Sequence, residues 1–428
     1  MKDKLKLPSI VLLALNAIIG SGIFLLPNKV MSLIGPASIG VILFDMLLVI
    51  SIALCFAEAA GMFSKNGGPY LYAKEAFGDF VGFEVGFMKW AISIIAWAAM
   101  AVAFANALGK VWAPAGEPFN QNVIVVCVLV GLGIVNILGV NFSRVLGNII
   151  TVSKLVPLII VIAVGIFFIN GKNFTPVFSG PNGTYVSGSF GAAALLLFYA
   201  FTGFESIGVA AKDMEDPQKN IPKAIIIVML IVSIFYILLQ VVSIGVLGKQ
   251  LSTELTPIQT VARTIMGPFG NALVAAGTLI SIGGINVAAA FITPRSGVAL
   301  AEDGLVPKVV AKQSKKGTPY VAIIITVVLA IPIALSGSFT TLAAISVVSR
   351  FVQYVPTCLS IPVLRKKKEL TSSFRVPFGP VIPIIAVLVS FWLLIQSSMQ
   401  QIAWGLGGLL IGVPFYFLMK YSNKKHAK

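Results

Sequence analysis

The stretch NAIIGSGIFLLP (residues 16–27) places three very small residues, Gly20, Ser21 and Gly22, inside an apolar run that otherwise predicts a membrane helix. In a bilayer, backbone N–H and C=O groups must find partners within the protein, so an unwound segment is tolerated only where protein surrounds it or a cavity adjoins it. Small residues also allow a membrane helix to pack closely against a neighbour. The stretch therefore indicates either a tight helix contact or a break in the helix, and the rest of the sequence helps to decide between them.

The composition is that of an all-α integral membrane protein. The 428 residues are 57% hydrophobic and 11% charged, with a mean hydropathy of +0.97, which is too apolar for a soluble protein of this length. A bilayer core needs roughly 20 apolar residues per helix, so the apolar runs can be counted. They predict twelve transmembrane helices, at 9–34, 37–62, 80–108, 123–142, 146–170, 191–214, 223–247, 266–300, 319–335, 339–363, 380–400 and 403–420.

Basic residues give the chain a formal net charge of +16. They are spread over loops rather than gathered on one surface, so we expect the lipid bilayer, and no nucleic acid, as a partner. Most of them fall at the termini and in one set of alternate loops, while the opposite set holds Lys29, Lys110, Lys172, Lys249 and Arg263. By the positive-inside rule, this asymmetry predicts a multi-pass protein of the cell membrane with both termini in the cytoplasm.

The residue types needed for hydrolytic or metal-assisted catalysis are scarce. The one histidine, His426, lies in the basic C-terminal tail, so the sequence offers no histidine-based metal site and no Ser-His-Asp arrangement. Cys55, Cys127 and Cys358 fall inside predicted helices, and the sequence contains no G-x-x-x-x-G-K-[ST] motif for nucleotide phosphates. We therefore expect no enzyme activity, no metal and no cofactor.

The predicted helices repeat after five. The first is interrupted at residues 20–22 and the sixth at Thr202-Gly203, within YAFTGFESIGV (residues 199–209), while the third and the eighth are both unusually long. Because five is odd, the second copy must be inverted in the membrane. The sequence thus predicts two inverted repeats, 1–170 and 191–363, followed by helices 11 and 12 within 380–420. Interrupted helices at matching positions indicate a transporter site near the middle of the bilayer.

The two breaks are expected to expose opposite kinds of backbone group. Free N–H groups at Gly20, Ser21 and Gly22, at the positive end of a half-helix, suit a carboxylate. Carbonyl groups before each break suit a cation, and the candidates are those of Ala17, Ile18, Tyr199, Ala200 and Thr202. A site that offers both fits a zwitterion, and an α-amino acid is the zwitterion we expect.

Several stretches, in this order, make the chain resemble the amino acid, polyamine and organocation transporter superfamily along essentially its whole length. They are GSGIFLLP (20–27), GGPYLYAKEAFG (67–78), FTGFES (201–206) followed by KDMEDPQKNIPKA (212–224), and SGVALAEDG (296–304). The closer resemblance is to bacterial relatives of the L-amino acid transporters that exchange alanine, serine and cysteine.

The resemblance implies a LeuT-type fold with helices 1 and 6 unwound at mid-membrane, and sodium-independent transport. It places the substrate carboxylate at residues 20–22 and the substrate amine at the carbonyl groups of Ile18, Tyr199 and Thr202. Eukaryotic relatives pair with a single-span glycoprotein through a disulfide. Since no cysteine of this sequence falls in a predicted outer loop, we expect no disulfide-linked ancillary subunit.

Lys154, within TVSKLVPLII, lies about eight residues, or roughly 12 Å, into the fifth predicted helix. Its side chain either snorkels to the cytoplasmic interface or ends within the protein. Sodium-independent relatives have a lysine at the matching place, where sodium-coupled relatives bind an ion near the first break. The resemblance therefore implies that the ammonium group of Lys154 replaces a cation.

Four further residues are candidates for gating or coupling. Tyr236 places a hydroxyl near mid-membrane, where it either packs as an aromatic residue or hydrogen-bonds the first break or the gate. Gly203 belongs to the second break, and Phe204, together with Tyr199, is an aromatic gate candidate. Glu205 follows directly, and a carboxylate at this depth is costly without a partner.

The sequence thus predicts a sodium-independent membrane transporter that exchanges small neutral L-amino acids, of the alanine, serine and cysteine type, by alternating access. Two alternatives remain open: a proton-coupled symporter of broader or cationic amino acids, and a channel, since broken helices also line pores. The sequence does not assign partners to four charged residues inside the predicted helices, which are Asp45, Glu58, Lys89 and Arg350.

Overall fold

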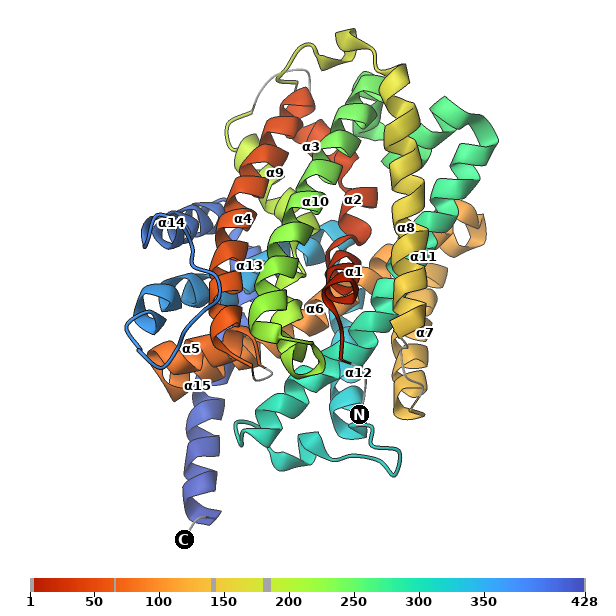
Figure 1. The fold of residues 1–428 in the computed structure, drawn as a ribbon. Coiled ribbons are helices and arrows are strands. Elements are labelled where there is room, and N and C mark those ends of the chain that lie inside the picture. Colours follow the sequence, from red (N-terminus) through yellow and green to blue (C-terminus); the bar gives the residue numbers. More distant parts are fainter. Residues whose placement is uncertain (1–3, 65–66, 140–143, 180–185, 427–428) are drawn as a thin grey trace.

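The computed structural model describes residues 4–64, 67–139, 144–179 and 186–426, which form a bundle of helices (Figure 1). The α-helices are α1 (Leu7–Ile18), α2 (Ser21–Leu25), α3 (Pro27–Ile34), α4 (Ser38–Met62), α5 (Pro69–Phe77), α6 (Asp79–Val111), α7 (Pro118–Ile137), α8 (Arg144–Gly165), α9 (Ser189–Phe198), α10 (Pro217–Leu247), α11 (Pro257–Glu302), α12 (Tyr320–Leu335), α13 (Phe339–Leu364), α14 (Val381–Ile395) and α15 (Met399–His426). Within these described ranges, β-structure is limited to an isolated bridge between Leu5 and Met214.

The helices have the length and the surface of a membrane protein. Nine helical segments of the described chain are long and apolar enough to cross a bilayer, and three shorter apolar helices, α1, α12 and α14, accompany them. Large apolar side chains lie on the outside of the bundle, for example Leu410 and Ile411 of α15, which are 79% and 63% exposed. Because so extensive an apolar exterior is stable only against lipid, the chain is a multi-pass membrane protein.

Several of the expected helices differ in detail from the structure; that at 191–214, for example, is α-helical only to Phe198 and continues as 3-10 segments. The expected helix at 9–34 is divided into α1, α2 and α3. The expected helix at 266–300 lies within α11, where Gly267 (φ +64°) interrupts the helical backbone close to the predicted start. In place of the expected helix at 123–142, α7 ends at Ile137, and residues 140–142 lie outside the described residues.

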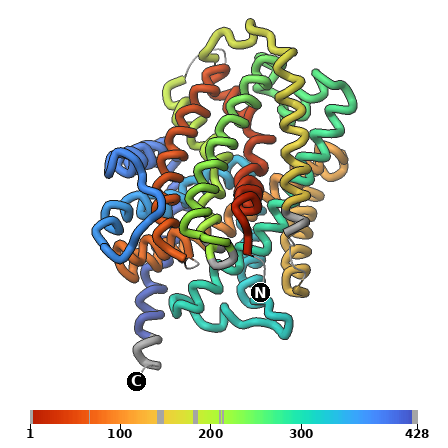
Figure 2. Tube along the Cα trace, in the orientation of Figure 1, coloured from red at the N-terminus to blue at the C-terminus, as the bar shows by residue number. Residues whose placement is uncertain are grey.

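Helices that are far apart in the sequence lie side by side in the bundle. α4 packs along α10, and α6 packs along both α11 and α13. The short α1 packs against α10 and α8, and Figure 2 shows it as the dark red coil between the green and the yellow helix. Both ends of the described chain lie toward the lower end of the view in Figure 1. The end of α1 is therefore shielded from lipid by neighbouring helices, which lets its backbone stop being helical there.

An ion pair with a buried carboxylate connects the end of α4 to the end of α13. The guanidinium of Arg365 donates two hydrogen bonds to the carboxylate of Glu58, at 2.6 and 2.7 Å, and Glu58 is fully buried. The backbone N–H of Val376 donates a third, at 2.6 Å. The hydrogen bond to Glu58 raises the pKa of Arg365. These contacts assign a partner to Glu58 and tie the segment after α13 to the bundle.

Removing the carboxylate of Glu58 should destabilise the protein. In the Glu58→Ala variant, the amide of Val376 loses its acceptor and Arg365 keeps only the carbonyl of Val376, at a cost of about 2 kcal/mol or more. Thermal unfolding of the detergent-purified protein measures the effect. Glu75→Ala is the matched control, because the Glu75–Lys367 pair is about 40% exposed on both sides and such pairs contribute roughly 0–1 kcal/mol. Equal melting temperatures for the two variants would contradict a structural role of Glu58.

Candidate functional site

The first break lies between α1 and α2. α1 ends at Ile18, Ile19 is extended (ψ 98°), Gly20 has φ −131° and ψ −144°, and α2 begins at Ser21. A side chain at position 20 would come within 2.6 Å of Ile285 of α11, so glycine allows that helix to approach the break. The chain therefore leaves and resumes helical geometry within two residues.

The second break follows α9. One 3-10 turn, η6 (Tyr199–Phe201), leads to Thr202, which is extended (ψ 154°), and to Gly203, whose φ is +122°. Residues with a side chain rarely adopt that φ, so the position requires glycine. The chain continues as the 3-10 segment η7 (Phe204–Asp213).

The two breaks touch each other, backbone against backbone. A Cβ atom at Gly22 would lie 2.8 Å from the Cα of Ala200, and one at Gly203 would lie 2.9 Å from the carbonyl carbon of Ala17. Real Cβ contacts are essentially never that short. Each break thus uses a glycine to admit the backbone of the other.

Backbone groups of both kinds remain without partners at the first break. Among the described residues, the amide groups of Gly20, Ser21 and Gly22 donate no hydrogen bond, and the carbonyl groups of Ala17 and Ile18 accept none. Free amides at the start of α2 favour an anion, and free carbonyls at the end of α1 favour a cation. The break can therefore receive two opposite charges side by side.

Lys154 of α8 binds part of the group of carbonyls at the C-terminal end of α1. Its ammonium group donates hydrogen bonds to the carbonyl oxygens of Asn16, at 2.9 Å, and Ile19, at 2.5 Å, and the side chain is fully buried. The positive charge lies at the C-terminal end of α1, where the helix dipole is negative. Lys154 therefore satisfies two carbonyls and leaves those of Ala17 and Ile18.

A cavity of about 140 Å³ joins the two breaks. It is bounded by both breaks and by α6, α11 and α13, and its size is below the roughly 300 Å³ at which pockets for drug-sized ligands begin. On α6, the Met100 sulfur accepts hydrogen bonds from the hydroxyls of Ser21, at 3.3 Å, and Tyr199, at 3.7 Å. The thioether thus links the first break to the second across the cavity wall.

A buried ionic cluster holds the second break to α13. The Glu205 carboxylate accepts a hydrogen bond from the backbone N–H of Gly203, at 2.9 Å, and one from the hydroxyl of Tyr354, at 3.1 Å. It also forms a salt bridge with Arg350, and the two side chains are 4% and 11% exposed. Glu205 therefore has its charge compensated and fixes the amide of the break.

The other expected gating residues lie around the second break, outside the cavity lining. The hydroxyl of Tyr236 donates to the carbonyl oxygen of Ala200 at 2.9 Å, which belongs to the second break and not to the first. The ring of Phe204 stacks on Tyr354, with centroids 5.6 Å apart, and is fully buried. Tyr236 and Phe204 thus contact the second break from outside the cavity and hold its backbone in place.

The structure brings most of the expected binding residues into one cavity. Its lining includes Ala17, Ile18, Gly20, Ser21, Gly22, Tyr199, Ala200, Thr202, Gly203 and Glu205. Two of the expected amine-binding carbonyls already have partners: that of Tyr199 accepts from Thr202, and that of Ala200 from Tyr236. Sequence reasoning missed Met100 and Tyr354, because nothing distinguishes one residue of a long apolar helix from the next.

Among the four charged residues without assigned partners, Asp45 differs from the rest. Glu58 pairs with Arg365, Arg350 pairs with Glu205, and Lys89 lines the cavity. Asp45 of α4 is fully buried, and in the described part of the chain neither of its carboxylate oxygens has a hydrogen-bond partner.

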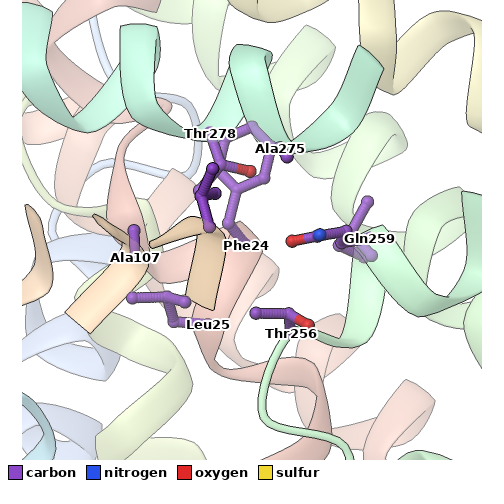
Figure 3. Close-up of a pocket in the computed structure, with 9 residues that line it drawn as sticks. Phe24, Leu25, Ala107, Thr256, Gln259, Ala275 and Thr278 are labelled. Atoms are coloured by element: carbon purple, nitrogen blue, oxygen red, sulfur yellow. The ribbon is translucent and has the colours of Figure 1, made fainter. Parts of the chain in front are cut away.

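A much smaller cavity lies on the far side of α2. Figure 3 shows the ring of Phe24 between Ala275 and Thr278 of α11, with Gln259 and Thr256 across from it. Its volume of about 10 Å³ has room for roughly one water molecule. Phe24 of α2 is 2% exposed and lines this cavity together with α11.

Known proteins similar to this chain are membrane carriers. Residues 5–416 match the protein family described as amino acid permease. An uncharacterized transporter of Mycobacterium tuberculosis is 31% identical over 97% of this chain and 90% of its own length. Two proteins of Bacillus subtilis are 28% identical: the serine/threonine exchanger SteT, over 98% of this chain and 97% of its own, and the branched-chain amino acid permease BcaP, over 100% and 94%. The similarity therefore includes both breaks.

Adding a methyl group at Gly203 should separate the two breaks. In Gly203→Ala, the new Cβ overlaps the Ala17 carbonyl and the backbone keeps an unfavourable φ, at a combined cost of about 1–3 kcal/mol. A lower melting temperature of the purified protein is expected. Gly131→Ala in α7 is the control, because a Cβ there meets nothing within 4 Å. If both variants melt like the unmodified protein, the breaks are not held by backbone contact.

Proposed function

Because the chain belongs to the amino acid permease family, we propose that it exchanges small neutral L-amino acids, of the alanine, serine and cysteine type, across the cell membrane without sodium. Family membership makes it a transporter and not an enzyme. The observation that carries the proposal is the first break, where free amides and free carbonyls adjoin one cavity. The exchange activity of the relative SteT and the permease name of BcaP add support.

The proposed substrate site holds the zwitterion by its two charged groups. The α-carboxylate accepts hydrogen bonds from the amides of Gly20, Ser21 and Gly22. The α-ammonium donates to the carbonyls of Ala17 and Ile18. The carbonyls of Ala200 and Thr202 complete this side, since a carbonyl oxygen with one partner retains a second lone pair. The carbonyl of Tyr199 already accepts from both the amide and the hydroxyl of Thr202.

The proposed architecture is a LeuT-type fold with twelve transmembrane helices. The nine long and three short apolar helices support that number. In this proposal, residues 1–170 and 191–363 are inverted repeats, residues 380–420 add two helices outside them, and the two breaks lie at mid-membrane. Such repeats transport by alternating access, in which one part of the bundle rocks around the fixed site.

Sodium independence is proposed from the position of Lys154. Its ammonium group already contributes a positive charge at the carbonyl end of α1, through the bonds to Asn16 and Ile19. A cation bound at the same carbonyls would be repelled by it. Gating is proposed for the residues that shape the second break, which are Tyr199, Gly203, Phe204, Glu205 and Tyr236.

The proposed orientation places both termini in the cytoplasm. It follows the excess of Lys and Arg in one set of loops, and agrees with the two chain ends lying toward one end of the bundle in Figure 1. Cys55, Cys127 and Cys358 lie within α4, α7 and α13, so the proposal includes no disulfide-linked ancillary subunit.

Exchange can be measured directly with the purified protein in proteoliposomes. Uptake of labelled alanine should accelerate when the liposomes contain alanine or serine, and should be independent of sodium and of a pH gradient, because one substrate replaces another at the same site. Empty liposomes are the control. Uptake that instead follows an imposed pH gradient would indicate proton symport, and flux that does not saturate would indicate a channel.

Replacing Lys154 tests the role of its charge. In Lys154→Ala, the carbonyls of Asn16 and Ile19 lose their donor, so alanine exchange should slow by about tenfold or more, equivalent to ~1.4 kcal/mol. Size-exclusion chromatography should still show a folded protein. Lys249→Ala, in which an exposed lysine is lost, is the matched control. Unchanged exchange in Lys154→Ala would rule out a coupling role.

A further inference from the structure

The cavity of the two breaks extends along α6 to a second end. Met100, beside Ser21, lines one end, and Lys89 of the same helix lines the other. At 1.5 Å per residue, about 16 Å of helix separates the two residues. The cavity is therefore longer than the substrate site proposed at the first break.

This second end carries an excess of positive charge. The charged residues among the described cavity lining are Lys89, Arg350 and Glu205. Arg350 is paired with Glu205, whereas the ammonium group of Lys89 makes no hydrogen bond or ion pair with any described residue. The guanidinium of Arg350 also keeps its Nε without a partner. One positive charge thus remains uncompensated in the lining.

Lys89 cannot be explained as a lysine that reaches the membrane surface. It lies about 15 Å from the start of α6 at Asp79, and the residue is only 9% exposed. A side chain of a helical residue leans toward the helix N-terminus, yet that of Lys89 still ends in the cavity with Arg350. An unpaired ammonium at membrane depth is costly, so its presence here favours a ligand of opposite charge.

We propose that Lys89, together with Arg350, forms a second station for the carboxylate of the transported amino acid. The inference rests on the proposed function, because it takes the ligand to be the same substrate. Ser296 and Gln353, which also line this end, add polar groups around a bound carboxylate.

A single substrate molecule does not reach from the amides of the first break to Lys89. An extended amino acid with an acidic side chain is shorter than two residues of backbone, or about 7 Å, whereas Lys89 lies about 16 Å along α6 from Met100, which stands beside Ser21. Arg350 adjoins the second break through Glu205, so Lys89 sets the distance of the second station from the first. The second station is therefore used before or after the first, as the substrate passes along the cavity. Its charge also repels cationic amino acids on the same path.

A carboxylate that lacks an amine tests this station through the part of its binding that depends on Lys89, because the amides of the first break also accept a carboxylate. Labelled propionate is dialysed to equilibrium against the full-length protein in detergent. Lys89→Gln should weaken its binding by about 10-fold or more, Lys89→Arg should retain it because the charge remains, and Lys249→Gln should match the unmodified protein. The glutamine variant removes the charge but keeps a long polar side chain, and size-exclusion chromatography checks that it folds.

Three results would overturn parts of the argument in distinguishable ways. Equal propionate affinity of Lys89→Gln and the unmodified protein, in a preparation that exchanges alanine in proteoliposomes, overturns the second station alone. Displacement of propionate by chloride as readily as by acetate overturns its assignment to carboxylates. Lys89-dependent propionate binding in a preparation that exchanges no amino acid overturns the proposed function, and with it the identity of the ligand as substrate.

Discussion

The contact between the two broken segments determines the rest of the site. Gly22 admits the backbone of Ala200, and Gly203 admits that of Ala17, so two interrupted helices meet without side chains between them. Because the contact is made by main chain on both sides, the positions of the free amides and carbonyls are set by backbone geometry and not by rotamers. The residues around it, Lys154 and Tyr236 above all, then bond to carbonyls whose places are already fixed.

Other protein groups form hydrogen bonds with most, but not all, of the backbone N–H and C=O groups that have no helical partner at the two breaks. Lys154 donates hydrogen bonds to two carbonyls at the end of α1, and Tyr236 donates one to the carbonyl of Ala200. Glu205 accepts a hydrogen bond from the amide of Gly203. What remains among the described residues is a set of amides at the start of α2 and two carbonyls at the end of α1. Buried polar groups without partners are costly, so this selective remainder is the strongest physical reason to expect a zwitterionic ligand.

The sequence was sufficient for features that composition and backbone chemistry dictate. Hydropathy predicted a multi-pass helical protein, and glycines in apolar runs identified the two segments where the helices are interrupted in the structure. It could not provide the pairing of Glu205 with Arg350 or of Glu58 with Arg365, because each pair joins helices that are distant in the chain. The role of Met100 could not be predicted from the sequence either, since it comes from facing Ser21 and Tyr199 and not from the residue type.

The cluster of Glu205, Arg350 and Tyr354 limits how the two breaks can move. Separating a buried ion pair costs several kcal/mol unless water or another charge replaces the lost partner. Since Glu205 also holds the amide of Gly203, the second break and α13 are expected to move as one unit. The contacts of Gly22 and Gly203, in contrast, are van der Waals contacts between backbones, so shifting the two breaks against each other separates no ion pair and strains only the weak hydrogen bonds to the Met100 sulfur. Relative motion is therefore cheapest between the two breaks, which is where the free amides and carbonyls lie.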